Sequence, residues 1–166
     1  MTHLPETQER NAPEEPRRIR SISVENWHRL SLEGCSMPTT ICLNGDSMRP
    51  LIRRNRDAVT IIPLRRPVKR GDIVLFADGD GRYVVHRVWK RGENTILTMG
   101  DHCTKPDRSL DPNQIWGLVT KVQRGNCCIA LDTRGARCLG CIWMGLLPIR
   151  ILYYNMKNRG ETHGTQ

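Results

Sequence analysis

The stretch Tyr-Val-Val-His-Arg-Val at residues 83–88 is rich in β-branched residues, a composition typical of a β-strand. Strand side chains alternate between two faces, so His86 shares its face with Val84 and Val88, whereas Arg87 lies on the other. A histidine ring buried in such a strand needs a hydrogen-bond partner. The stretch therefore predicts a strand whose central imidazole faces a second polar group.

Similar apolar runs occur on both sides of this stretch, separated by turn signals such as Asp-Gly-Asp-Gly at residues 78–81. The predicted strands cover residues 39–43, 58–63, 72–77, 82–90, 95–99, 115–123 and 127–132. Regular spacing with local turns favours a mainly β fold, built as a curled antiparallel sheet or a small β-barrel.

A helix is expected at each end of this β region. Residues 24–32 predict a short helix, with Ser23 as its N-cap and Gly34 at its end. Between residues 137 and 158, apolar residues recur at helical intervals and Pro148 interrupts them. This pattern predicts an amphipathic C-terminal helix that is kinked or broken.

The composition allows one hydrophobic core. The chain has 166 residues, of which 38% are hydrophobic, and two full domains would be a stretch at this length. The first 20 residues are mostly polar and lack the apolar segment of a secretory signal or membrane anchor. The predicted organisation is a disordered polar and basic tail at 1–21, one β domain at 22–133, and a C-terminal helix and tail at 134–166.

The net charge of +9 points to an anionic partner. The basic residues occur in pairs spread along the chain, without a helix-turn-helix, zinc-finger or base-stacking pattern, so no nucleic-acid partner is expected. An anionic membrane surface is a better match than nucleic acid for this positive net charge. Solvated surface charge is the simpler alternative.

The C-terminal helix is the candidate membrane contact. Its uncharged run at residues 138–149 has 12 residues, too few to cross a bilayer as a helix. We expect residues 137–159 to rest on an anionic membrane surface, or else only to cover the open end of the sheet. The side chains assigned to the membrane are Trp143, Tyr153, Tyr154, Arg150, Lys157 and Arg159. The expected location is cytoplasmic or peripheral to a membrane, without a transmembrane helix.

Seven cysteines, an odd number, indicate reduced thiols and no disulfide framework. Cys138 and Cys141 have the spacing of zinc ligands, but the adjacent pair Cys127 and Cys128 cannot form the usual second knuckle. We therefore expect no metal site, and most of the cysteines to be buried as small hydrophobic residues.

A serine follows the first predicted strand of the β region, within Gly-Asp-Ser-Met-Arg-Pro at residues 45–50. A serine hydroxyl becomes a good nucleophile when a base takes its proton, and a neutral imidazole suits that task near pH 7. An acidic residue must then orient the imidazole, and Asp107 or Asp101 can fill this role. Taken singly, each residue has a simpler structural use as a cap, core or turn residue.

The order of these segments resembles the type I signal peptidases, whose nucleophile box reads Gly-X-Ser-Met-X-Pro. Residues 69–76 look like that family's Arg-Gly-Asp-Ile-Val strand, residues 85–88 like its general-base box, and residues 98–107 like its final Gly-Asp box. The resemblance covers residues 42–122, and four ordered boxes are far more specific than one. Most bacterial members have lysine at the position of His86, so this chain resembles the branch typified by the endoplasmic-reticulum enzyme.

The resemblance implies a signal-peptidase type of β fold with a catalytic Ser47, His86 and Asp107. It ranks Asp107 above Asp101 and places Asp111 third, with Asp101 in a structural pair with Arg87. Two departures from the family concern the site. His102 stands where the family often has asparagine, and offers a second imidazole. Gly45 stands where some members have a hydroxyl that helps to bind the oxyanion. The residues expected to support the site are Gly45, Met48, Arg87 and Asp101.

The function implied by the resemblance is a serine endopeptidase that cleaves signal or leader peptides and needs no cofactor or metal. The peptide would bind extended along a strand edge, with small residues next to the cleaved bond. Two alternatives stay open: a soluble self-cleaving relative, and a non-catalytic module that binds peptides or anionic surfaces on a peptidase fold.

Overall fold

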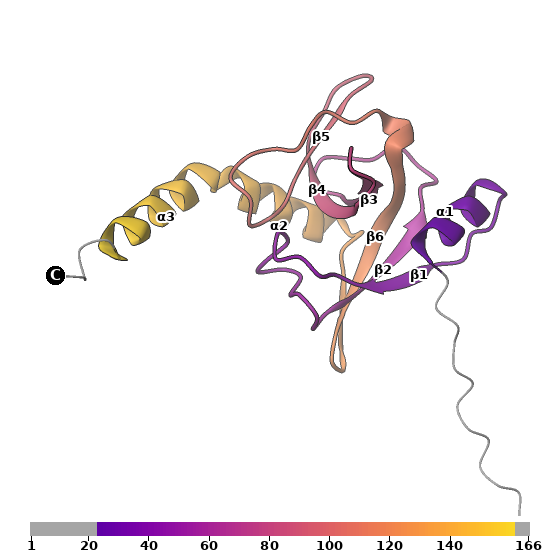
Figure 1. Ribbon diagram of the computed structural model, residues 1–166, viewed down its shortest axis with the longest axis horizontal. Coiled ribbons are helices and arrows are strands. Elements are labelled where there is room, and N and C mark those ends of the chain that lie inside the picture. The colour runs from indigo at the N-terminus through magenta and orange to yellow at the C-terminus, as the bar shows by residue number, and fades with distance from the viewer. Residues whose placement is uncertain (1–22, 162–166) are drawn as a thin grey trace, which may run out of the picture.

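The computed structural model describes residues 23–161, so the predicted tail at residues 1–21 lies outside the described residues. The described chain is mainly antiparallel β-sheet with a helix before it and two helices after it (Figure 1). The helices are α1 (Val24–Leu32), α2 (Arg134–Gly145) and α3 (Leu147–Glu161), with a short 3-10 helix at Pro112–Gln114. The strands are β1 (Thr39–Cys42), β2 (Ala58–Pro63), β3 (Ile73–Ala77), β4 (Tyr83–Arg91), β5 (Ile96–Met99), β6 (Ile115–Arg124) and β7 (Cys127–Ala130).

The seven strands form one sheet in the order β1-β2-β6-β3-β4-β5, and β7 pairs with β6 beside this path. Every pair of neighbours is antiparallel. The edge strands β1 and β5 have four residues each. Strand β1 pairs only with β2, and β5 pairs with β4 and forms a single bridge from Ile96 to Leu110, so the described strands do not close into a barrel. The prediction of a mainly β fold with an antiparallel sheet is confirmed, whereas the alternative of a closed barrel is wrong.

Helix α1 follows the sequence prediction. The Ser23 hydroxyl accepts a hydrogen bond from the Asn26 N–H at 3.2 Å, and Gly34 ends the helix with a left-handed φ of 96°. Trp27 is the one buried residue of α1, and its indole N–H donates to the Met37 carbonyl at 2.8 Å. These contacts fix α1 at the end of the sheet away from α2 and α3 (Figure 1).

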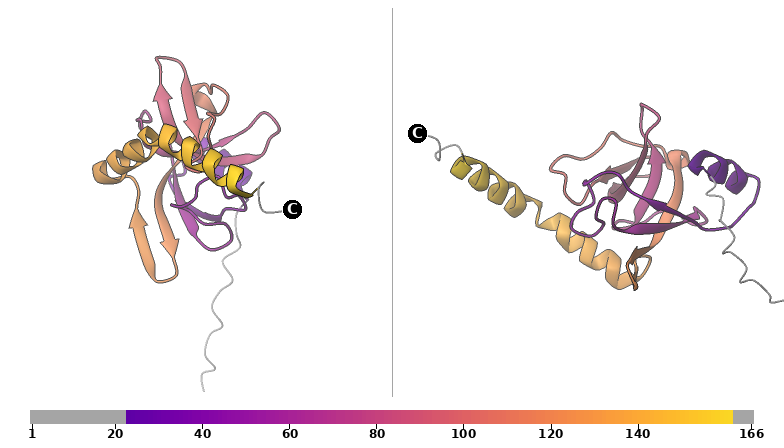
Figure 2. Two further views of the ribbon diagram at one scale, coloured as in Figure 1. Left: turned by 90° about the vertical axis from the view of Figure 1, so that its left-hand side faces the viewer. Right: turned by 60° about the horizontal axis from the view of Figure 1, so that its bottom comes forward.

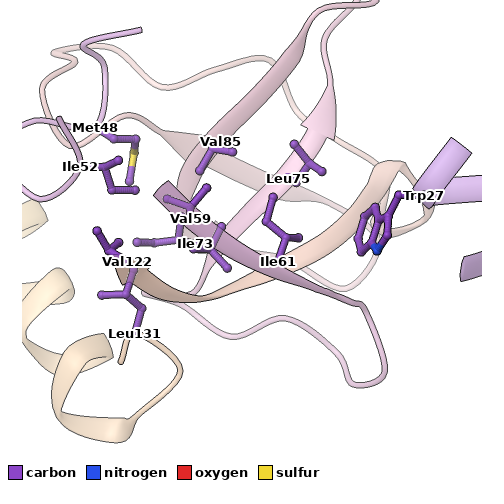
Figure 3. Close-up of a cluster of buried hydrophobic side chains, with 11 residues drawn as sticks. Trp27, Met48, Ile52, Val59, Ile61, Ile73, Leu75, Val85, Val122 and Leu131 are labelled. Carbon is purple, nitrogen blue, oxygen red and sulfur yellow. The ribbon is translucent and has the colours of Figure 1, made fainter. Parts of the chain in front are cut away.

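Two hydrophobic clusters make up the core. Figure 3 shows the larger one, which runs from Trp27 at one end to Met48 and Ile52 at the other. The second cluster includes Phe76 and Val88. Because Met48 is 1% exposed, the residue after Ser47 is anchored in the larger cluster, and the position of Ser47 depends on the core.

The C-terminal helices form a bent rod, with α3 extending away from the sheet (Figures 1 and 2). The break falls at Leu146, between α2 and α3, rather than at Pro148, which lies in the first turn of α3 where proline is tolerated. No single helix in the described part of the chain is long and apolar enough to cross a membrane. Helix α2 and residues Leu147–Tyr153 of α3, bent by 49°, satisfy the length and hydropathy criteria only as a pair.

Two of the side chains assigned to a membrane face the β domain instead. The Trp143 indole N–H donates to the Asp101 carbonyl at 2.9 Å, and the buried Arg150 donates to the same oxygen. That part of the prediction is wrong, because both side chains find a polar partner inside the molecule. Tyr153 is 63% exposed. The side chains of Tyr154, Lys157 and Arg159 lie outside the described residues.

Candidate active site

Ser47 lies on a turn that follows β1. The turn is closed by the Arg49 N–H, which donates to the Asp46 carbonyl at 3.1 Å, and by the Ile52 N–H, which donates to the Met48 carbonyl at 2.9 Å. Its backbone is therefore fixed while its hydroxyl stays half-buried at the surface of the sheet.

His86 lies at the centre of β4 and forms hydrogen bonds with both predicted partners. Its Nδ1 is 2.6 Å from Asp107 Oδ2, and its Nε2 is 2.9 Å from Ser47 Oγ. An ionised carboxylate only accepts hydrogen bonds, so the Nδ1–H donates to Asp107 and the neutral ring accepts the Ser47 hydroxyl proton at Nε2. The His86 side chain is 9% exposed. The Phe76 ring packs against the imidazole in an edge-to-face arrangement, and the two ring centroids are 6.2 Å apart.

Asp107 is held in place by β5. Its Oδ2 also accepts a hydrogen bond from the Thr98 hydroxyl at 2.6 Å, and its backbone N–H donates to the Thr98 carbonyl at 2.8 Å. Thr98 is completely buried. Its role is not among those predicted from the sequence, although a hydroxyl in an otherwise apolar strand is a signal that a buried polar partner is present.

Asp101 belongs to a separate, buried ion pair. The Arg87 guanidinium donates to its two carboxylate oxygens at 2.7 and 2.6 Å, and to the Gly71 carbonyl at 3.0 Å. The expected pairing of Asp101 with Arg87 is present in the structure. Asp111, the third candidate, caps the 3-10 helix by accepting from the Asn113 N–H at 2.8 Å.

Gly100 is a glycine because nothing larger fits between the site residues. A Cβ at this position would lie 2.6 Å from the Ser47 carbonyl oxygen, 3.0 Å from His86 Nε2 and 2.7 Å from Cys103 Sγ. The next residues also support the nucleophile, because the His102 N–H donates to the Ser47 carbonyl at 2.7 Å. The His102 side chain is exposed, and it is His86 that forms the hydrogen bond with the serine hydroxyl.

Cys103 is the second nucleophilic side chain beside the imidazole. Burial raises the pKa of its thiol, and the charge of Asp107 adds to this effect. A thiol with a raised pKa is largely protonated near pH 7, and the protonated form is a weak nucleophile. The site therefore favours the Ser47 hydroxyl, whose proton has an acceptor, over the Cys103 thiol.

Two surface cavities meet at this site. One, of about 360 Å³, is lined by Gly45, Ser47 and the tip of the β3–β4 hairpin. The other, of about 750 Å³, is lined by Asp107 and the residues that follow it. His86 lines both, so a chain lying across the two cavities would pass over the imidazole.

The seven cysteines all lie within the described residues. All seven are free thiols, and residues 23–161 contain no group of three or more His, Cys, Asp or Glu side chains that could hold a metal ion. The expectation that most cysteines are buried is wrong. Four are exposed, because β7 and α2 present them on outer faces and β1 presents one at the sheet edge: Cys42, Cys127, Cys128 and Cys138.

No known protein-family model matches this chain, and neither does any curated protein. The functional inference therefore depends on the geometry of Ser47, His86 and Asp107 and on the sequence motifs around them.

Proposed function

We propose that this protein is a serine endopeptidase of the signal peptidase I type, which cleaves signal or leader peptides. Ser47 is the nucleophile, His86 the general base and then the general acid, and Asp107 the residue that orients His86. The observation that carries the proposal is the pair of hydrogen bonds that His86 makes, at 2.9 Å to Ser47 Oγ and at 2.6 Å to Asp107 Oδ2.

In the proposed reaction, Ser47 Oγ attacks the carbonyl carbon of the peptide bond while its proton passes to His86 Nε2. The tetrahedral intermediate collapses when the Nε2–H protonates the leaving amine, which leaves an acyl group on Ser47. A water molecule then attacks this ester, with His86 again as the base, and releases the acid. Asp107 keeps the proton on Nδ1 and stabilises the imidazolium that forms in each step.

The substrate binds extended, with its cleaved bond over Ser47. The cavity of about 360 Å³ beside Gly45 and Ser47 has room for a small side chain next to that bond. The cavity of about 750 Å³ beyond His86 accepts the next part of the chain. Backbone hydrogen bonds along a strand supply affinity in this mode, and the cavities supply selectivity.

The cleavage assay uses a fluorogenic leader-like peptide with alanine next to the cleaved bond. Wild type should cleave it, and Ser47→Ala should lose activity by more than about 1,000-fold while keeping its melting temperature. His86→Ala should behave in the same way, and His102→Ala should stay active. Full activity in Ser47→Ala would end the proposal, and loss in His102→Ala alone would move the role of base to His102.

Two controls separate the alternative functions. Incubation of the purified protein alone, followed by mass spectrometry, detects a self-cleaving relative as a shortened chain that Ser47→Ala does not produce. A non-catalytic module would bind the peptide with equal affinity as wild type and as Ser47→Ala, and would cleave it in neither form.

A peripheral contact with an anionic membrane is proposed for the outer face of α2 and α3. Residues 138–149 carry no charge, and several large apolar side chains of these helices are more than 60% exposed. They are Leu139, Ile142, Ile149, Leu152, Tyr153 and Met156, which we call the outer apolar face. Leu139 and Ile142 also line a cavity between α2 and the β domain. A protein of net charge +9 with such a face suits an anionic bilayer surface.

A further inference from the structure

One peptide group connects the nucleophile to the C-terminal helices. The peptide between Asp101 and His102 donates through the His102 N–H to the Ser47 carbonyl at 2.7 Å. The carbonyl of the same peptide, that of Asp101, accepts from the Trp143 indole N–H at 2.9 Å and from the Arg150 guanidinium. Because a peptide group is planar and rigid, a rotation that breaks one of these contacts also moves the other.

Arg150 is buried where it donates to the Asp101 carbonyl. It is 9% exposed, and its guanidinium carbon lies 4.6 Å from the centre of the Trp143 ring. Within the described residues, its Nε and Nη1 atoms are buried without a hydrogen-bond partner. Burying a guanidinium is costly, so the interactions with the Asp101 carbonyl and with the Trp143 ring are the ones that hold it there.

Helix α2 contacts the Asp101 side chain through Arg87. A Cβ on Gly140 would lie 2.2 Å from Arg87 Nη1, so the helix backbone lies directly against the guanidinium that binds Asp101. Beside this contact, an apolar cavity of about 390 Å³ separates part of α2 from Leu131. The polar contacts around Asp101 therefore add to the packing of the buried Gly140 and Met144 in holding α2 on the β domain.

We propose that Trp143 and Arg150 are positioning residues for the nucleophile, which they hold through the Asp101–His102 peptide. This inference deepens the proposed peptidase function and depends on it for its kinetic consequences. With either donor removed, the peptide rotates, its N–H moves from the Ser47 carbonyl, and Ser47 Oγ moves out of line with His86 Nε2. The C-terminal helices are thus part of the apparatus that aligns the serine.

The kinetic test uses the full chain and the fluorogenic peptide with alanine next to the cleaved bond. Trp143→Phe keeps an aromatic side chain and removes the indole N–H donor. Arg150→Met keeps most of the side-chain volume and removes the guanidinium charge. Each should lower kcat by about tenfold or more and leave KM within about twofold, because a small misplacement of reacting groups slows the chemical step. Arg150→Lys should recover part of kcat, since an ammonium group also donates to the Asp101 carbonyl.

Matched controls come from α2. Arg134→Met removes the same charge from an exposed position, and Cys138→Ser changes an exposed side chain near Trp143, so both should keep the wild-type kcat. An unchanged kcat in Trp143→Phe and Arg150→Met would overturn the proposal. A rise in KM at constant kcat would also overturn it, because it would assign these residues to substrate binding.

A second readout does not need a substrate. In hydrogen exchange followed by NMR, the His102 amide should exchange about tenfold faster in Trp143→Phe than in wild type, while the Val59 amide in the core of the sheet is unchanged. Equal exchange of the His102 amide in both proteins would overturn the positioning role, even if no peptide is cleaved. Absence of cleavage by wild type would instead contradict the proposed function, so the two failures are distinguishable.

Discussion

At the scale of the residue, Ser47 is held by its backbone and left available at its hydroxyl. Its carbonyl accepts from the His102 N–H at 2.7 Å, and Met48 is anchored in the core. The hydroxyl therefore has one evident use, the hydrogen bond to His86 Nε2 at 2.9 Å. Position 45, two residues before the serine, has no side-chain donor for the oxyanion, because it is a glycine.

Gly45→Ser should raise kcat. A Cβ at this position would have only Ser47 Oγ near it, at 4.0 Å, and the φ of Gly45 is one that other residues adopt, so a serine fits. One good oxyanion donor changes the rate by about 100-fold in other serine enzymes, and a donor added without optimisation should raise kcat severalfold. Steady-state cleavage of the fluorogenic peptide measures the effect.

The matched control is Gly45→Ala, which adds the same Cβ without the hydroxyl. Its kcat should equal that of wild type. If serine and alanine have the same effect at position 45, the oxyanion lies elsewhere.

Thr98→Val should lower kcat by about tenfold and change the melting temperature little. The substitution removes the hydroxyl that donates to Asp107 Oδ2 at 2.6 Å but keeps the shape of a completely buried side chain. Asp107 then loses one of its two side-chain partners and orients His86 less well. Peptide cleavage and thermal unfolding of Thr98→Val, with Thr98→Ser as the variant that keeps the hydroxyl, test this expectation.

The candidate site was largely predictable from the sequence. Ser47 and His86 follow from their motifs, the resemblance to signal peptidases ranks Asp107 above Asp101, and these three side chains lie within hydrogen-bond distance. Thr98 and Gly100 were missed, because their roles depend on side chains from other strands and loops that approach them only in the folded chain. Spacing along the sequence does not encode such contacts.

At the scale of the element, the strands were predicted to within two residues at each end, because β-branched runs and glycine turns define them locally. Their order in the sheet was not predictable. Strand β6 lies between β2 and β3, so residues 115–124 pair with two segments about 40 to 65 positions away. The cavities and the bend between α2 and α3 follow from this tertiary arrangement.

The junction between β6 and the loop before β2 supports the nucleophile turn. Arg124 donates to Asp57 at 2.6 Å and to the Leu51 carbonyl at 2.9 Å, and Asp57 accepts from the Arg53 N–H at 2.9 Å. Asp57 is completely buried. The Arg124 guanidinium holds the pKa of the Asp57 carboxyl below its usual range.

Arg124→Met should destabilise the protein most at neutral pH. A carboxyl whose pKa is lower in the folded state stabilises the fold above its unfolded pKa of about 4, and this contribution is lost as the pH falls through the folded pKa. Without Arg124, the free energy of unfolding at pH 7 should fall by about 3 kcal/mol, and acid unfolding should begin at higher pH. Urea unfolding at several pH values measures both effects.

Arg82→Met is the control that removes an exposed ion pair instead of a buried one. Arg82 pairs with Asp78 and Asp80 at the tip of the β3–β4 hairpin, where its side chain is 73% exposed. Loss of an exposed pair should change the free energy of unfolding by less than about 1 kcal/mol. Equal losses in Arg82→Met and Arg124→Met would show that the buried pair has no special role.

At the scale of the whole molecule, the α2–α3 rod is attached to the β domain near Asp101, and α3 extends away from the sheet (Figure 2). The side chains of the outer apolar face are exposed. Trp143 and Arg150 donate to the Asp101 carbonyl and do not belong to this face, although Leu139 and Ile142 also line the apolar cavity beside Trp143. Membrane contact and alignment of Ser47 therefore use different side chains of the same helices.

The wild-type protein should sediment with anionic vesicles. The double variant Ile142→Asp and Ile149→Asp should bind these vesicles about tenfold more weakly or worse. Each substitution removes a large apolar side chain from the outer apolar face and adds a charge that an anionic surface repels. Co-sedimentation with phosphatidylserine-containing vesicles, and with phosphatidylcholine vesicles as the neutral control, measures the effect. Wild-type protein that stays in solution with both would contradict the membrane proposal.

The most direct test of the catalytic assignment is the identity of the residue that becomes acylated. An ester substrate is mixed with the protein, the reaction is quenched in acid within the first turnover, and the modified residue is located by mass spectrometry. The acyl group should be on Ser47, and His86→Ala should form this adduct far more slowly. An acyl group on Cys103, or turnover without any adduct on Ser47, would contradict it.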